Sequence, residues 1–293
     1  MIYKICHSTE YRYPAPVRNS HNELRLMPLS DLWQTCRRFT LHVEPEARLF
    51  AYELPDGRVH HFSHRQPHDF LKITAESEVE SCNSDPFEHL DLIGDDQGFY
   101  RQPHVYNDFC EYLDPTERVP ADRYIEIECE QIAASARQEV LTGSTAAFLI
   151  ALTKLLHREF RYEPGSTHVH TKIEEVFIYR RGVCQDFAQV MLAVCRNQRI
   201  PARYVSGYLY TGKNGLISND ATHAWVECLM PDGSWHGFDP TNDMVVNDAY
   251  IRTHTGRDYS DVAPVRGLYQ GPPATKLNVL VTVERVDRPV NEA

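Results

Sequence analysis

One cysteine of the chain, Cys184, stands where a helix is expected to begin. Apolar residues follow it with the spacing i, i+3, i+4 and i+7, at Phe187, Val190, Met191 and Val194. This spacing predicts an amphipathic helix whose first turn holds Cys184. The first turn of a helix offers unpaired N–H groups and a positive partial charge, and both stabilise a thiolate. Such a thiolate could attack a carbonyl carbon, and the backbone N–H of Cys184 would face the resulting oxyanion.

Other interpretations of this segment stay open. A free cysteine is often a small buried residue, which would leave Cys184 without a chemical role. Asp186 shares the first turn, where its charge favours the helix but opposes a thiolate. Cys195 lies about three turns further along the same helix, has no helix terminus to activate it, and is assigned to the core.

A cysteine nucleophile needs a base, and the base needs a group that orients it. His223 and Asp239 flank Pro231-Asp-Gly233, which predicts a hairpin between two strands. If Met230 pairs with Ser234, Asp239 lies on the same face as His223 and within its reach. A register shifted by one residue would move Asp239 to the opposite face. The catalytic interpretation therefore predicts a three-residue connection, or a bulge that restores the same parity.

Rival interpretations apply to these residues as well. His236 in the second strand is another candidate base, and Asp239 before a proline could simply start a turn. The catalytic interpretation is favoured by the conjunction of a helix-terminal Cys with a His and an Asp on one hairpin face. A metal-dependent hydrolase is suggested by four histidines, at His60, His61, His64 and His68. Their spacing fits no standard zinc pattern, so we expect a solvated hairpin there and no metal or cofactor.

These residues must be positioned by a fold of class α+β. Residues 1–80 contain short runs rich in Tyr, Val, Phe, Thr and Ile between prolines and turns, including a hairpin signal at Pro55-Asp-Gly57. They predict an N-terminal antiparallel β-sandwich domain. Residues 81–122 have no steady period and are interpreted as a linker or irregular wrap. Residues 123–270 would form the catalytic domain, and the β-branched run in 271–293 predicts a strand that rejoins the N-terminal sheet.

Two helices are expected ahead of Cys184. Ser144 or Thr145 can cap the first, which runs toward Phe160. For the second, from about Lys172 to Tyr179, the sequence Thr171-Lys-Ile-Glu174 fits a capping box.

Composition excludes several classes of protein. The chain has 293 residues and a formal net charge of −11, which argues against nucleic acid as a partner. The longest apolar run, Ala146–Leu152, is far shorter than the roughly 20 residues that cross a bilayer. The eight cysteines form no CxxC pair, and no apolar signal core follows Met1. We therefore expect a cytoplasmic protein with free thiols and no membrane partner.

Four segments together resemble the bacterial transglutaminase-like superfamily: Gly182–Ala188, Arg199–Tyr208, Ala221–Trp225 and Gly237–Asn242. Within it the chain resembles the subfamily often called "putative cysteine proteases", which has an extra N-terminal β domain. The resemblance implies a papain-like core, in which a helix carrying the nucleophile packs on an antiparallel sheet. It also implies Cys184 as nucleophile, His223 as general base and acid, and Asp239 as the residue that orients the imidazole.

The expected activity is thiol-dependent acyl transfer. Cys184 would form a thioester from a peptide bond or a Gln or Asn carboxamide of a protein substrate, and water would hydrolyse it in a cysteine protease or amidase. Attack by an amine would instead make the enzyme a cross-linking transglutaminase, and a catalytically silent interaction module is the alternative of another class. Trp225, Tyr208 and Gln185 are candidates for lining the substrate cleft. The sequence predicts no oligomeric state.

Overall fold

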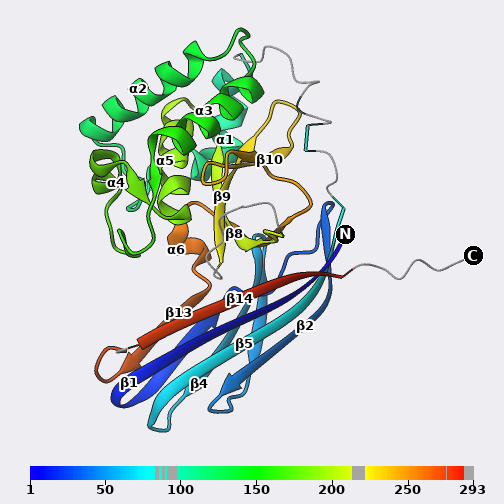
Figure 1. The fold of residues 1–293 in the computed structure, drawn as a ribbon, viewed down its shortest axis with the longest axis vertical. Coiled ribbons are helices and arrows are strands. Elements are labelled where there is room, and N and C mark those ends of the chain that lie inside the picture. The colour runs from blue at the N-terminus through cyan, green and yellow to red at the C-terminus, as the bar shows by residue number, and fades with distance from the viewer. Residues whose placement is uncertain (83–85, 88–89, 91–97, 213–221, 275, 287–293) are drawn as a thin grey trace, which may run out of the picture.

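A computed structural model describes residues 1–82, 86–87, 90, 98–212, 222–274 and 276–286. A curled, strand-rich domain lies at one end of the molecule, and helices gather around a second sheet at the other (Figure 1). This arrangement confirms the expected α+β class.

The N-terminal domain is built from strands β1 to β5 with β13 and β14 added from the end of the chain. Their bounds are β1 Ile2–Leu24, β2 Gln34–Glu44, β3 Phe50–Leu54, β4 Gly57–His64, β5 His68–Ser81, β13 Val265–Gln270 and β14 Lys276–Val286. Hydrogen bonding joins them in the order β2-β5-β1-β4-β3, with β13 and β14 both pairing with β1. The Pro55-Asp56 hairpin is confirmed, because Leu54 pairs with Gly57 across it.

Strand β1 belongs to both layers of this domain. Residues 2–12 pair with β5 and β14, whereas residues 18–24 pair with β4 and β13. The change of partners falls at Pro14 and Pro16, which have no N–H to donate to a ladder. The sheet therefore folds over, and Tyr13, Phe62 and Ile73 pack in the core between its layers. The expected sandwich is thus a single curled sheet (Figure 1).

The second domain surrounds a five-stranded sheet of order β11-β10-β9-β8-β12. Its strands are β8 Ala202–Leu209, β9 His223–Leu229, β10 Trp235–Asp239, β11 Met244–Val245 and β12 Tyr250–Gly256. Its helices are α2 Arg123–Gln138, α3 Thr145–Glu159, α4 Ile173–Tyr179, α5 Cys184–Asn197 and α6 Tyr259–Val262, and a small parallel pair joins β6 Arg161–Tyr162 to β7 Arg181–Gly182. Helix α5 packs on β8 and β9, and its Val190 and Met191 belong to the same buried cluster as Val226 and Phe238.

The expected helices are present, but one cap differs. Ser144 caps α3 by accepting a hydrogen bond from the N–H of Ala147, as predicted. The capping box at Thr171 is wrong, because α4 starts one residue later with Lys172 at its N-cap. The Thr171 hydroxyl instead accepts from the N–H of His168, and this competing turn explains the difference.

The segment between the domains is only partly described. It contains η1 Phe99–Arg101, α1 Pro103–Phe109 and η2 Cys110–Tyr112. Residues 83–85, 88–89 and 91–97 of the expected 81–122 linker lie outside the described residues. Among the described residues, no helix is both long and apolar enough to cross a membrane.

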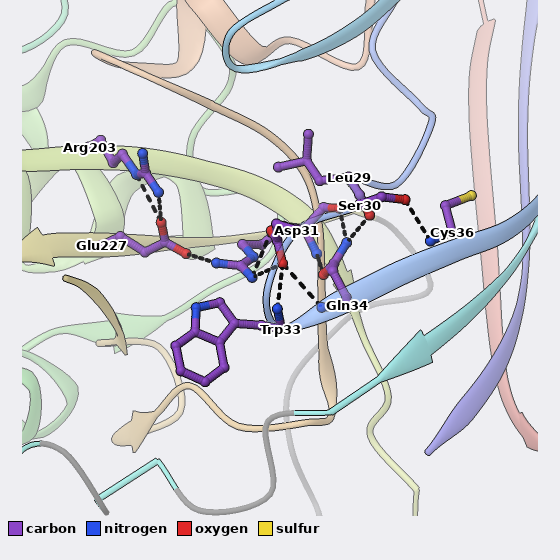
Figure 2. Close-up of polar contacts among 9 residues, drawn as sticks. Leu29, Ser30, Asp31, Trp33, Gln34, Cys36, Arg203 and Glu227 are labelled. Carbon is purple, nitrogen blue, oxygen red and sulfur yellow. Dashed lines mark hydrogen bonds and ion pairs between the residues drawn. The ribbon is translucent and has the colours of Figure 1, made fainter.

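The two domains share a buried interface. Tyr3 and Ile5 of β1 and Val281 of β14 pack in one apolar cluster with Tyr208 and Ile251 of the five-stranded sheet. A polar network lies beside it, in which Asp31 and Gln34 face the strand that carries Glu227 (Figure 2).

Candidate active site

Cys184 is the first residue of α5, as the sequence predicts. Val183 occupies the N-cap without a side-chain cap, and the carboxylate of Asp186 at N3 reaches back to accept from the N–H of Val183 at 2.8 Å. The Cys184 N–H belongs to the first turn, where a helix provides no internal acceptor. Cys184 is half-buried and packs at the margin of the helical core.

Two hydrogen bonds hold the Asp186 side chain in place at the start of α5. Its carboxylate accepts from the hydroxyl of Thr167 at 2.6 Å as well as from Val183. Burial raises the pKa of Asp186 despite these hydrogen bonds, so its charged form is less favoured than that of an exposed aspartate. Gly182 makes this packing feasible, because a Cβ there would lie 2.5 Å from Asp186 Oδ2.

The hairpin carrying the other two residues has the predicted register. Met230 pairs with Ser234 through a hydrogen bond of 2.8 Å, which leaves a three-residue connection. Gly233 ends this turn with φ +83°, a conformation that favours glycine. His223 and Asp239 therefore project from one face of β9 and β10.

His223 and Asp239 form a buried pair. His223 Nε2 lies 2.7 Å from Asp239 Oδ2, and both side chains are excluded from solvent. Burial lowers the pKa of His223, but Asp239 and then the nearby Cys184 outweigh it and raise the pKa to about 10. Burial raises the pKa of Asp239, but His223 and the groups that donate to it outweigh this and lower the pKa. The pair therefore favours an imidazolium next to a carboxylate.

Asp239 has further partners that the sequence analysis missed. Its Oδ2 accepts from Asn242 Nδ2 at 2.7 Å and from the Tyr250 hydroxyl at 2.8 Å, and its Oδ1 accepts from the N–H of Thr241 at 2.9 Å. Asn242 also lies 3.5 Å from His223 Nε2. The bond from Thr241, two residues after Asp239, is an Asx turn, so the sequence carried a signal for this contact. Tyr250 carried no local signal because it comes from a different strand.

Two of the three residues proposed to line the substrate cleft are buried. Trp225 is fully buried, with its ring 6.1 Å from that of His223, so it packs beneath the imidazole and cannot line an open cleft. Tyr208 is also buried, and its hydroxyl donates to Leu26 of the N-terminal domain at 3.3 Å. Both predictions are wrong because each side chain is covered: Trp225 packs with Val205 and Tyr250 on one face of the sheet, and Tyr208 packs against the N-terminal domain on the other. Gln185 is half-buried beside Cys184.

The rival residues are separated from this cluster. His236 pairs with Cys228 and lies three residues before Asp239. Because side chains alternate along a strand, His236 projects from the face of the sheet opposite to that of Asp239. The four histidines of residues 60–68 belong to β4 and β5 of the N-terminal domain. No group of three or more His, Cys, Asp or Glu side chains in the described part of the chain is arranged to hold a metal ion. All eight cysteines are free.

Known proteins are similar to this chain in fold and in sequence. The chain matches the bacterial transglutaminase-like N-terminal region over residues 3–80 and the transglutaminase-like superfamily over residues 131–240. A crystal structure of a "putative cysteine protease" from Cytophaga hutchinsonii covers 99% of this chain and 92% of its own, with TM-score 0.75 and 21% identity. This likeness defines the fold as a transglutaminase-like core with an N-terminal β domain.

Relatives in sequence establish the family. An uncharacterized protein of Mycobacterium leprae is 33% identical over 97% of this chain and 98% of its own length. A protein-glutamine gamma-glutamyltransferase of Pseudomonas aeruginosa is 34% identical over 97 residues, which are 31% of this chain and 14% of that protein. The chain belongs to the transglutaminase-like superfamily.

Proposed function

We propose that this protein is a thiol-dependent acyl-transfer enzyme, a transglutaminase-like cysteine hydrolase. The observation that carries the proposal is the placement of Cys184 at the start of α5, near enough to His223 to raise its pKa, with His223 held in turn by the buried Asp239 at 2.7 Å. This is the arrangement of nucleophile, base and orienting acid that acyl transfer requires.

The reaction proceeds in two steps. The Cys184 thiolate attacks the carbonyl carbon, and the first-turn N–H of α5 stabilises the oxyanion. The C–N bond then breaks while the His223 imidazolium protonates the departing amine, which leaves a thioester on Cys184. His223, now neutral, takes a proton from water, whose oxygen attacks the thioester and releases the acid and the thiolate. Asp239 stabilises the imidazolium form of His223 throughout, and this chemistry needs no metal or cofactor.

Cross-linking is the second candidate, since an amine can replace water in the last step. It is supported by the similarity to the gamma-glutamyltransferase of Pseudomonas aeruginosa, within the limited stretch that the two share. We favour hydrolysis because the described residues contain no acidic cluster suited to calcium, and no lysine-binding feature stands out.

The proposed substrate is a protein or peptide, attacked at a peptide bond or a Gln or Asn carboxamide. The net charge of −11 disfavours nucleic acid as a partner, and we propose no membrane partner. The eight free cysteines support a cytoplasmic location, where thiols stay reduced.

Mass spectrometry of a peptide library incubated with the protein tests the activity. Truncated peptides indicate a protease, conversion of Gln or Asn to the acid indicates a deamidase, and amine adducts indicate a transglutaminase. Cys184→Ala and His223→Ala should each abolish the products while the fold persists, whereas Cys82→Ala, at an exposed cysteine, should leave them unchanged. A Cys184→Ala protein with normal turnover would refute the proposal, and a folded wild type with an unreactive Cys184 would instead indicate the silent interaction module.

A further inference from the structure

The side chain of Gln34 completes the free edge of β12. Its Oε1 accepts from the N–H of Arg252 at 2.8 Å, and its Nε2 donates to the carbonyl oxygens of Arg252 and Leu29 at 2.9 and 2.8 Å. The N–H of Leu29 donates to the same Arg252 carbonyl at 2.9 Å. Since β12 is an edge strand, the buried amide of Gln34 takes the place of a peptide group in a neighbouring strand.

The Arg252 side chain is fixed to the same N-terminal segment. Its guanidinium donates to Asp31 at 2.9 Å and to Glu227 at 3.2 Å, and Glu227 also accepts from Arg203 at 2.7 Å. Figure 2 shows Asp31 and Gln34 on one side of this network, with Arg203 and Glu227 on the neighbouring strands β8 and β9. Burial raises the pKa of Glu227, but Arg203 and Arg252 outweigh it and lower the pKa, so the network is ionised.

The same strand carries a ligand of the candidate site. Tyr250 precedes Arg252 by two residues and therefore projects from the same face of β12. The Tyr250 hydroxyl donates to Asp239 Oδ2 at 2.8 Å, the oxygen that also contacts His223. Strand β12 is paired with β8 on one side and bonded by Gln34 on the other, so Gln34 supports the strand that holds Asp239 through Tyr250.

We propose that Gln34 is a positioning residue for the candidate active site, through which the N-terminal domain supports the orientation of Asp239. Gln34 fixes β12 at Arg252, β12 fixes Tyr250, and Tyr250 holds the carboxylate that stabilises the His223 imidazolium. This inference rests on the proposed function, because the orientation of Asp239 matters only if His223 serves Cys184.

The test measures the rate of iodoacetamide alkylation of Cys184 against pH in the full-length protein. Gln34→Met keeps the side-chain length and removes all three hydrogen bonds. Loss of support for the imidazolium weakens its stabilisation of the adjacent thiolate, so the acid limb of the rate profile should move up by about one pH unit. Gln34→Glu retains the acceptor for the Arg252 N–H but turns an oxygen toward the carbonyl oxygens of Arg252 and Leu29, so it should shift the acid limb in the same direction and provides a second variant if Gln34→Met folds poorly.

A double-mutant cycle with Tyr250→Phe separates positioning from general loosening. If Gln34 acts through Tyr250, the double variant should shift the acid limb no further than Tyr250→Phe alone. Tyr208→Phe is the matched control, because it removes an interdomain hydrogen bond from β8; it should lower thermal stability and leave the profile in place.

The results separate a failure of the positioning role of Gln34 from a failure of the proposed function. An unshifted profile in both Gln34 variants, additive shifts with Tyr250→Phe, or an equal shift in Tyr208→Phe would overturn the inference and leave the proposed function standing. A wild type in which Cys184 is no more reactive than the exposed cysteine would refute the proposed function itself.

Discussion

At the residue scale, Asp239 is held by more contacts than an orienting carboxylate needs. Both oxygens accept hydrogen bonds, from His223, Asn242 and Tyr250 on one and from Thr241 on the other. An asparagine offers a single acceptor oxygen, so it cannot satisfy both sets of donors. The contacts therefore demand a carboxylate rather than any residue that starts a turn.

Asp239→Asn should lower turnover by about ten-thousandfold, because the imidazole loses its orienting charge. The raised pKa of His223 gives stability that is fully present below its ordinary value of 6.5 and is lost as the pH rises toward about 10. The lowered pKa of Asp239 gives stability that is present above its ordinary 3.8 and is lost in acid. The wild type should therefore exceed the variant in unfolding free energy most between these two ordinary values, as measured by urea titration across pH. A difference that grows above pH 7 would contradict this.

At the element scale, the start of α5 and the β9–β10 hairpin place the reactive groups. Local signals predicted both: apolar spacing for the helix, and Pro-Asp-Gly with strand parity for the hairpin. The cleft was predicted less well, since Trp225 and Tyr208 are buried by contacts far away in sequence. Likewise Tyr250 reaches Asp239 from another strand, a contact set by the order of strands in the sheet. Spacing along the chain does not encode such contacts.

The close packing at the start of α5 gives a prediction for Gly182→Ala. The added methyl group would lie 2.5 Å from Asp186 Oδ2, so the carboxylate must move and release the Val183 N–H. We expect a loss of about 1–3 kcal/mol in unfolding free energy and slower alkylation of Cys184. Gly98→Ala is the matched control, since nothing lies within 4 Å of its added Cβ. Equal stability of the two variants would show that the Gly182 packing is unimportant.

At the scale of the whole molecule, the two domains are joined by an apolar cluster and an ionic network. Tyr3 and Tyr208 bury each domain's surface against the other, and Arg252 connects Asp31 with Glu227. The N-terminal domain could be predicted as strand-rich, but its role as a support for β12 could not, because no local pattern links Gln34 to Arg252.

This coupling predicts that the two domains unfold together, as one calorimetric transition. Glu227→Gln should shift that whole transition and lower the unfolding free energy by about 3 kcal/mol, because the Arg203 guanidinium loses its charge partner and Arg252 keeps only its pair with Asp31. Glu10→Gln, which removes an exposed pair with Arg12, should change it by less than about 1 kcal/mol. Two separate transitions in the wild type would contradict the coupling.

The alkylation rate of each cysteine at pH 6, measured by peptide mass spectrometry, tests whether Cys184 is an activated nucleophile. We expect half-buried Cys184 to react at least about tenfold faster than exposed Cys82, and His223→Ala to remove this excess. A Cys184 that reacts no faster than Cys82, or whose rate is unchanged by His223→Ala, would contradict the activation of Cys184.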